Sequence, residues 1–181
     1  CNSPLVWDQI MLDAIKVYSR ANQAVLFTPF VLSGASTTAS VIGSLVQINA
    51  EALAGIAFAQ IVRPGVPAVY GQCIGAVSMK SGAPMAGTPE IDQINLLVGQ
   101  MARHYKLPWR CSGACTSAKI FDAQAGYEAA RNLYGAALAG ANFILSTTGY
   151  MEGALCQSFA KYVVDAEQAE LTHKFLKGID F

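Results

Sequence analysis

One predicted turn of this sequence combines cysteines, small residues and a lysine. The segment CSGACTSAKIFD (111–122) follows the apolar residues LPWR and precedes an alanine-rich stretch with helical spacing. A lysine that is desolvated at the end of a strand can form a Schiff base with a carbonyl substrate, and Lys119 has that position. A solvated lysine, or one paired with Asp122, explains the same letters. The turn therefore leaves lysine chemistry open.

The cysteines of this turn raise the question of a metal site. Cys111 and Cys115 have the spacing CxxxC, but no second pair of ligands lies near them in the sequence, since His104 and His173 are isolated. Structural zinc needs four such ligands. The pattern favours small cysteines packed beneath the turn, and we predict no metal site.

A carboxylate and several aromatic residues are further candidates. Glu152 could be a general base or a counter-charge for a cationic substrate, although a surface carboxylate is an equal explanation. Phe27, Phe30, Tyr70 and Tyr150 fall at or just beyond predicted strand ends. Aromatic faces bind quaternary ammonium groups by cation–π attraction, whereas the alternative is that these rings belong to the core. The sequence has no GxSxG motif, which disfavours a serine hydrolase.

The elements that would position these residues follow a repeated pattern. A short apolar β-rich run, a Gly/Ser/Thr-rich turn and a longer amphipathic stretch recur, which is typical of βα units around a parallel sheet. Strands are predicted to start near residues 24, 68, 109 and 142. Helices are predicted over 8–21, 36–62, 88–106, 122–140 and 161–178, with Thr88 and Asp122 as N-caps.

Loop chemistry favours one α/β architecture over another. A nucleotide-binding sheet normally carries a GxGxxG or P-loop motif, and GQCIGA (71–76) has neither the spacing nor a following helix. We therefore expect a (β/α) TIM-type barrel, with chemistry in the loops that follow the strands. About four βα units form one domain over 1–181, whereas a complete barrel takes about 250 residues. The chain is expected to be an incomplete portion of a barrel, with the chemistry in loops 33–37, 70–88, 111–120 and 146–153.

Composition limits the partners. The sequence has 12 basic and 12 acidic residues and no basic cluster, which gives no electrostatic signal for nucleic acid or a membrane surface. We found no uninterrupted apolar run long enough to cross a bilayer. The five scattered cysteines and the lack of a signal peptide predict reduced thiols and a cytoplasmic protein.

Longer blocks of the sequence resemble a known family. NAEALAGIAFAQIVRPGVPAVYG (49–71), SGAPMAGTPE (81–90), DAQAGYEAARNLYGAALAGANFI (122–144) and GYMEGALCQSFAKYVVDAE (149–167) resemble the trimethylamine methyltransferase family in the same order. The resemblance covers most of the chain. Because family members are longer, it implies an internal to C-terminal portion of their barrel.

The resemblance implies corrinoid-dependent methyl transfer. Such enzymes move a methyl group from a methylated amine to the Co(I) of a separate corrinoid protein, which supplies the cobalamin-type cofactor and docks at the barrel mouth. The amine leaves only when its nitrogen is positively charged. Archaeal trimethylamine enzymes of the family use pyrrolysine, whereas this chain has only the twenty standard residues. A quaternary amine such as glycine betaine is therefore the expected substrate, and trimethylamine is second.

The resemblance also suggests positions for the site. Relatives often carry acidic residues where this chain has Ser78 and Ser117–Ala118, so the carry-over of contacts is restricted to a few positions. The residues expected to act in catalysis are Glu152 and Lys119, and those expected to bind substrate are Tyr70, Gln72, Tyr150 and Phe30.

Two other functions stay open at this stage. Lys119 could serve an aldolase-like barrel enzyme, which borohydride trapping would reveal. The other alternative is a non-catalytic relative that only binds methylammonium compounds. Half a barrel has two unpaired strand edges, so we also expect a homo-oligomer, another partner chain or the rest of the barrel to cover them.

Overall fold

The computed structural model describes residues 1–179 and has an α/β architecture with a parallel sheet. The strands and helices alternate along the chain, as the repeated pattern predicts. The helices are α1 (Gln9–Arg20), α2 (Val41–Val62), α3 (Pro89–Tyr105), α4 (Ala123–Leu138) and α5 (Phe159–Leu176). The strands are β1 (Val25–Phe27), β2 (Phe30–Ser33), β3 (Ala68–Gly71), β4 (Cys73–Val77), β5 (Pro84–Met85), β6 (Trp109–Ser112), β7 (Phe143–Leu145), β8 (Tyr150–Met151) and β9 (Cys156–Gln157), and η1 (Glu152–Ala154) is a short 3-10 turn.

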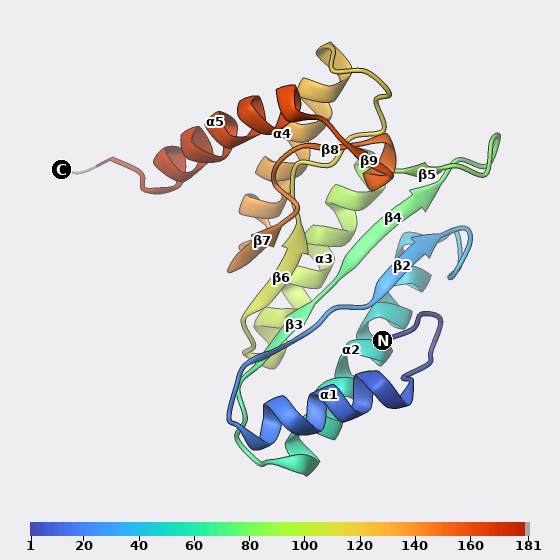
Figure 1. Cartoon of the computed structure of the whole chain (residues 1–181), viewed down its shortest axis with the longest axis vertical. Helices are drawn as coiled ribbons and strands as arrows, with labels where there is room; N and C mark the ends of the chain where they lie inside the picture. The colour runs from blue at the N-terminus through green and yellow to red at the C-terminus, as the bar shows by residue number, and fades with distance from the viewer. Residues whose placement is uncertain (180–181) are drawn as a thin grey trace.

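The main sheet has four parallel strands in the order β1-β3-β6-β7. Each strand lies beside the one that precedes it, and helices α2, α3 and α4 lie along one face of the sheet (Figure 1). Each helix packs against the next, from α1 to α5. A doubly wound sheet would reverse its strand order at a switch point. The arrangement is therefore consistent with part of a (β/α) barrel.

Strands β2 and β4 continue β1 and β3 beyond short breaks. The register pairs Phe30 with Cys73 and Ser33 with Ala76 in parallel, and β5 then pairs antiparallel with β4. The 70–88 segment, which the sequence predicts as the end of a strand and a long loop, is thus partly a sheet extension. Its glycines hid the strand, because the pattern has too few β-branched residues to be read as one.

Helix starts follow the predicted signals only in part. α3 begins at Pro89 as predicted, but the side chain of Thr88 makes no capping hydrogen bond. At α4 the prediction is confirmed, since Asp122 Oδ1 accepts a hydrogen bond from the Ala125 N–H at 3.2 Å. α2 begins later than predicted, because Ser40 and not an earlier residue of the Ser/Thr run provides the N-cap.

The two faces of the sheet differ in burial. Side chains alternate between faces along a strand. On the face toward the helices, Val31, Tyr70 and Trp109 pack with residues of α2 and α3, and each is at most 1% exposed. On the other face, which we call the inner face, exposed apolar side chains alternate with them. They are Leu26, Phe30, Phe143 and Leu145, 37–55% exposed.

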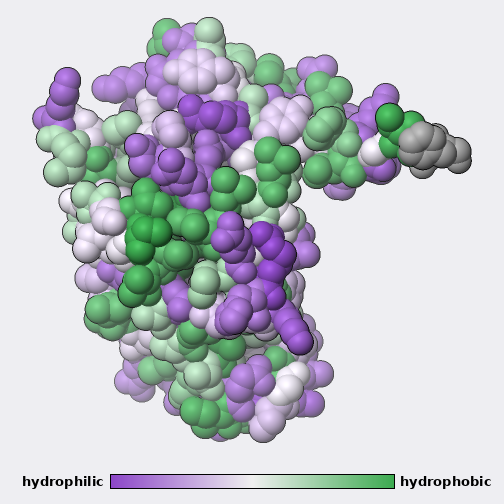
Figure 2. Space-filling view, turned by 180° about the vertical axis from the view of Figure 1, so that it is seen from behind, coloured by the Kyte–Doolittle hydropathy of each residue, from purple (hydrophilic) through white to green (hydrophobic). Residues whose placement is uncertain are grey.

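α2 has an unusual composition for a surface helix. Its only charged residue, Glu51, is 2% exposed and accepts hydrogen bonds from the Leu5 N–H and the Gln47 side chain. The outer side of the helix exposes Ile42, Val46 and Ile61, and apolar residues gather on this side of the molecule (Figure 2). Among the described residues α2 alone is long and apolar enough to cross a membrane, and here it packs on the sheet.

Candidate functional site

A cavity of about 380 Å³ lies at the carboxyl ends of the central strands, on the inner face. Ligand sites of parallel α/β folds lie at this end of the sheet. The cavity is in the size range of small-molecule pockets. Three of the four loops predicted to carry chemistry contribute to its wall, together with β2. The lining residues are Phe30, Leu32, Cys73, Gly75, Pro84, Met85, Ala86, Ile91, Ser112, Gly113, Cys115, Asn132, Ser146, Gly153, Ala154 and Leu155.

Two glycines permit the close approach of the loops around the cavity. A Cβ on Gly113 would lie 2.8 Å from the side chains of Ile144 and Thr147. Gly153 has a φ of +66°, and a Cβ there would lie 2.7 Å from the carbonyl oxygen of Pro84. Real side chains do not tolerate such contacts without movement of the backbone, and the positive φ is itself unfavourable for other residues. The sequence therefore needs glycine at both positions.

A buried carboxylate holds the loop after β6. Glu128 of α4 is 7% exposed, and its Oε2 accepts hydrogen bonds from Thr116 Oγ1 at 2.6 Å and from the Ser117 N–H at 2.8 Å. Ser117 Oγ in turn accepts a hydrogen bond from the Ala86 N–H at 2.8 Å. These bonds join the loop after β6 to the segment after β5. Both segments border the cavity, so α4 fixes its wall.

A buried ion pair on α5 joins the loop after β6 to a further loop. Lys161 and Asp165 form a salt bridge, and their side chains are 0% and 2% exposed. Lys161 Nζ also donates to the carbonyl oxygen of Ala114 at 2.8 Å, and Asp165 Oδ2 accepts from the Gly149 N–H at 2.8 Å. The pair thus links the loops that follow β6 and β7. It was not apparent from the sequence, because Lys161 and Asp165 look like an ordinary i,i+4 surface pair.

Two cysteines near the cavity, Cys111 and Cys115, are poor nucleophiles. Burial raises the pKa of Cys111 and the pKa of Cys115 to about 12 each, so both thiols stay protonated at neutral pH. Cys111 packs in the main apolar cluster, as the sequence favours. Within residues 1–179, no three His, Cys, Asp or Glu side chains come close enough together to hold a metal ion.

One of the predicted site residues lines the cavity, and a second lies next to a lining residue. Phe30 lines it and is 55% exposed. Glu152 is partly exposed and begins η1 next to the lining residue Gly153, with a φ of +50°. Its backbone N–H donates to the carbonyl oxygen of Ala118 at 3.1 Å, which brings the loop after β8 against the loop after β6. Tyr150 is partly buried in β8 and does not line the cavity.

Lys119 lies outside the cavity wall. It is exposed in the loop between β6 and α4. Among residues 1–179 it has no salt bridge, so neither Asp122 nor Glu152 is an ion-pair partner in this arrangement. Asp122 instead caps α4.

Tyr70 and Gln72 point away from the cavity, into the helix layer. The hydroxyl of Tyr70 donates to Asn49 Oδ1 at 3.0 Å, and its ring packs edge-on against Tyr105. Burial raises the pKa of Tyr70 well above its usual value. Gln72 is 1% exposed and donates a hydrogen bond to Asn95 Oδ1. The sequence placed both at a strand end but did not indicate which face they occupy.

Two polar residues, Asn132 and Arg110, were missed by the sequence reasoning. Asn132 of α4 lines the cavity, and its Nδ2 donates to the carbonyl oxygen of Cys115, while its buried Oδ1 has no hydrogen-bond partner in the described chain. Arg110 is the only charged residue in the nine strands of residues 1–179. A charge inside a predicted strand was the signal that could have identified Arg110.

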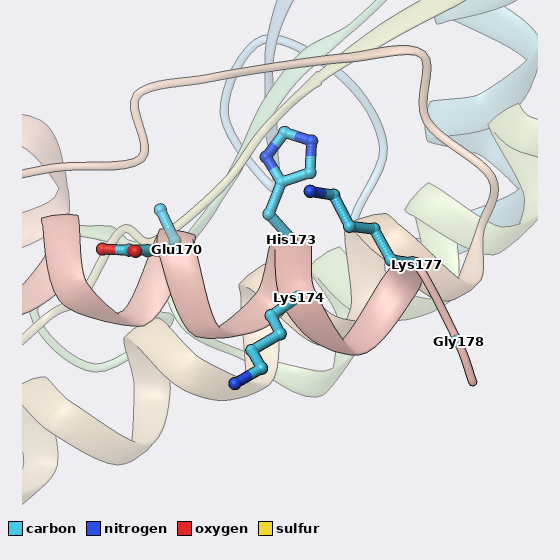
Figure 3. A pocket seen from close by; sticks show the side chains of 6 residues that line it. Glu170, His173, Lys174, Lys177 and Gly178 are labelled. Carbon is cyan, nitrogen blue, oxygen red and sulfur yellow. The ribbon is translucent and has the colours of Figure 1, made fainter. Parts of the chain in front are cut away.

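A larger hollow lies on the far end of α5 (Figure 3). Its side chains come from α5 and the residues just after it, and His173 and Lys177 point to the same side while Lys174 points away. These side chains are exposed, and no strand end contributes to the hollow. The smaller cavity at the strand ends is therefore the better candidate site.

Comparison with known proteins gives a consistent family. The family model described as trimethylamine methyltransferase (MTTB) matches residues 1–181. The chain is 38% identical to the glycine betaine methyltransferase of Desulfitobacterium hafniense (strain Y51) over 99% of its own length. It is 32% identical to the proline betaine:corrinoid methyltransferase of Eubacterium limosum over 98% of its length. It is 35% identical to the trimethylamine methyltransferase MttB1 of Methanosarcina mazei over 89%.

The matches cover only part of each relative. The aligned region is 37% of the glycine betaine and proline betaine enzymes and 32% of the Methanosarcina mazei enzyme. The chain thus spans about a third of the length of these relatives, while the family model matches it from its first residue to its last. On that match, the chain belongs to the trimethylamine methyltransferase family.

Proposed function

We propose that this chain forms part of the catalytic barrel of a corrinoid-dependent methyltransferase. In that barrel, further strands from the longer polypeptide would pair with the edges of the sheet at β1 and β7 and cover the inner face. The family match over the whole chain carries the proposal. The cavity at the strand ends supports it, because this is where barrel enzymes bind their substrates.

The proposed substrate is a quaternary ammonium compound such as glycine betaine, with trimethylamine second. Two of the relatives are named for betaines. A cavity of about 380 Å³ has room for a molecule of this size. Phe30, Leu32 and Met85 give it an apolar wall, which suits methyl groups, and the Phe30 ring can attract the positive nitrogen.

The proposed reaction is the transfer of one methyl group as its carbon–nitrogen bond breaks. The bonding electrons stay on nitrogen, which leaves as a neutral amine. The corrinoid of a separate protein supplies the cobalt that accepts the methyl group. The small side chain of Ser112 at the cavity fits an approach from the mouth, because it leaves space beside the substrate. No residue of the described chain has to act as a nucleophile.

The roles proposed for the site residues follow from their positions. Phe30 contacts the methylammonium group, and the free Oδ1 of Asn132 offers it a partial negative charge. Glu152 at the rim is a counter-charge for the cation. Tyr150 lies in β8, two residues before Glu152, and is proposed to support it, while Tyr70 and Gln72 act indirectly by fixing β3 and β4 from the helix side.

The test follows the visible spectrum of a corrinoid. The polypeptide that contains this sequence is mixed with a Co(I) corrinoid protein and with glycine betaine or trimethylamine. Spectral conversion that needs both the polypeptide and one amine supports the proposal and names the substrate. Binding of the amine with no conversion would instead select a non-catalytic methylammonium-binding protein.

A further inference from the structure

Arg110 is a buried charged residue to which the proposed reaction assigns no role. It lies in the middle of β6, where the register pairs it with Gly71 on one side and Phe143 on the other. Because its neighbours Trp109 and Cys111 pack in the core beneath the helices, strand alternation puts Arg110 on the inner face. It is nevertheless only 6% exposed.

The hydrogen bonds of Arg110 are incomplete. Its Nη1 donates to the carbonyl oxygen of Gln72 at 2.8 Å, and its buried Nε has no partner. No carboxylate among residues 1–179 forms a salt bridge with it. Burial of a guanidinium without an anion is unfavourable, since the charge loses its hydration and gains little in return. The position therefore calls for an anion that the described chain does not supply.

Arg110 is a neighbour of the candidate site, although it does not itself line the cavity. Ser112, two residues further along the same face of β6, lines the cavity, and so does Cys73 next to Gln72. The positive charge of Arg110 also counteracts the rise in the pKa of Cys115, another lining residue. A ligand that extends past Ser112 and Cys73 would thus meet a cation beyond the cavity wall, with Phe30 on the wall itself.

We infer that Arg110 is a carboxylate-binding subsite beside this cavity, which a ligand reaches past Ser112 and Cys73. The inference rests on the proposed function and makes it more specific, because a betaine carries a carboxylate as well as a quaternary nitrogen. Guanidinium groups bind carboxylates through paired, charge-assisted hydrogen bonds. With its carboxylate on Arg110, a betaine would direct its methylammonium group toward Phe30 and the mouth, where the methyl group leaves.

The carboxylate that binds Arg110 could come from two sources. The carboxylate belongs either to the substrate or to an Asp or Glu side chain from a part of the polypeptide outside this chain. A substrate carboxylate predicts discrimination between betaines and quaternary amines that lack the acid. If the carboxylate belongs to the protein, loss of its partner Arg110 should lower the stability. Binding should then not discriminate between betaines and quaternary amines that lack the acid.

The experiment measures binding by calorimetry in the full polypeptide that carries this sequence. The probes are glycine betaine and choline, which share the quaternary nitrogen and differ in the carboxylate. The variants are R110M and R110K. R103M is the matched control, because Arg103 Nη1 also donates to a backbone carbonyl, that of Ala139, but on α3 away from the cavity. Thermal unfolding is recorded for each protein.

The expected result is that R110M weakens betaine binding about 10- to 100-fold, the range for a hydrogen bond to a charged group. R110K should recover part of the loss, since it keeps the charge but not the paired geometry. Choline binding should not change in either variant, and R103M should change neither ligand. Arg110-dependent betaine binding without methyl transfer would leave this inference standing and overturn the proposed function.

Two results would overturn the substrate subsite. One is a large loss of thermal stability in R110M while the ratio of its affinities for betaine and choline equals that of the wild type. That result assigns the carboxylate to the protein. The other is that R110M changes neither the thermal stability nor the binding of betaine. That result would mean that Arg110 binds no carboxylate, either of the substrate or of the protein. If R110M does not fold, the wild type alone decides, because equal affinities for betaine, its methyl ester and choline contradict the inference.

Discussion

The two faces of the sheet are built from the same strands, but their side chains are buried to different degrees. Toward the helices, Tyr70 and Trp109 are at most 1% exposed and pack with α2 and α3. On the inner face, Phe30 and Phe143 are 55% and 48% exposed. The comparison shows that the helix face provides the stability of this chain, while the inner face holds the candidate site and remains open to further partners.

The difference has a physical origin in chain connectivity. Each βα unit covers its own strand on the helix face with contacts that are local in sequence, so α2, α3 and α4 complete that face within the chain. The inner face of a barrel is covered by strands from the opposite side. Those contacts are distant in sequence, and this chain spans about a third of the relatives' length.

The sharpest test of this contrast substitutes one large side chain on each face. Trp109→Ala is expected to lower the free energy of unfolding by about 3–5 kcal/mol, because it opens a cavity in the core. It also removes the hydrogen bond from the Trp109 indole to the carbonyl oxygen of Gly140. Phe30→Ala should change the stability of this chain by less than about 1 kcal/mol, since its ring is already half exposed. Urea unfolding of the two variants measures both.

Similar losses from the two substitutions would contradict the comparison. Leu26→Ala is the control for the inner face, since Leu26 is exposed there but lies outside the cavity. Phe30→Ala, unlike Leu26→Ala, should in addition weaken amine binding in the full polypeptide.

The second prediction concerns the buried ion pair that joins α5 to the cavity loops. Lys161→Met leaves the Asp165 carboxylate buried without its partner, and about 3–5 kcal/mol of stability should be lost. The double variant K161M/D165L should recover a substantial part, because it removes both charges. Chemical denaturation of the single and double variants gives the coupling between them. Equal stability of the single variant and the wild type would mean that the pair is solvated and does not fix the loops.

The sequence predicted where strands and helices begin better than it predicted which face of the sheet a side chain occupies. The four strand starts and the beginning of α3 at Pro89 follow from propensity and periodicity, and Asp122 caps α4 as predicted. Which face a residue occupies depends on register, so the burial of Tyr70 and Gln72 under the helices could not be read from their positions at a strand end. The pairing of Lys161 with the loop at Ala114 depends on contacts distant in sequence and was equally hidden.

The third prediction separates support from substrate contact at Tyr70. Tyr70→Phe removes the hydrogen bond to Asn49 and should cost about 0.5–1.5 kcal/mol of stability. Because the hydroxyl lies on the helix face, the KM for the amine should stay within about twofold of the wild type. A rise in KM of tenfold or more, with unchanged stability, would place the Tyr70 hydroxyl at the substrate and break the assignment of the two faces.

The smallest effect is expected at Lys119, which belongs to neither face. Its side chain is exposed, so Lys119→Gln should change the stability by no more than about 0.5 kcal/mol. Methyl transfer should also stay near the wild-type rate, because the lysine does not line the cavity. Borohydride treatment with carbonyl compounds, followed by mass spectrometry, should leave Lys119 unmodified, since this exposed lysine lies outside the cavity and a bound carbonyl group would not lie beside it. A stable adduct on Lys119 that is absent from the glutamine variant would show that this lysine forms a Schiff base, and would favour the aldolase-like function over methyl transfer.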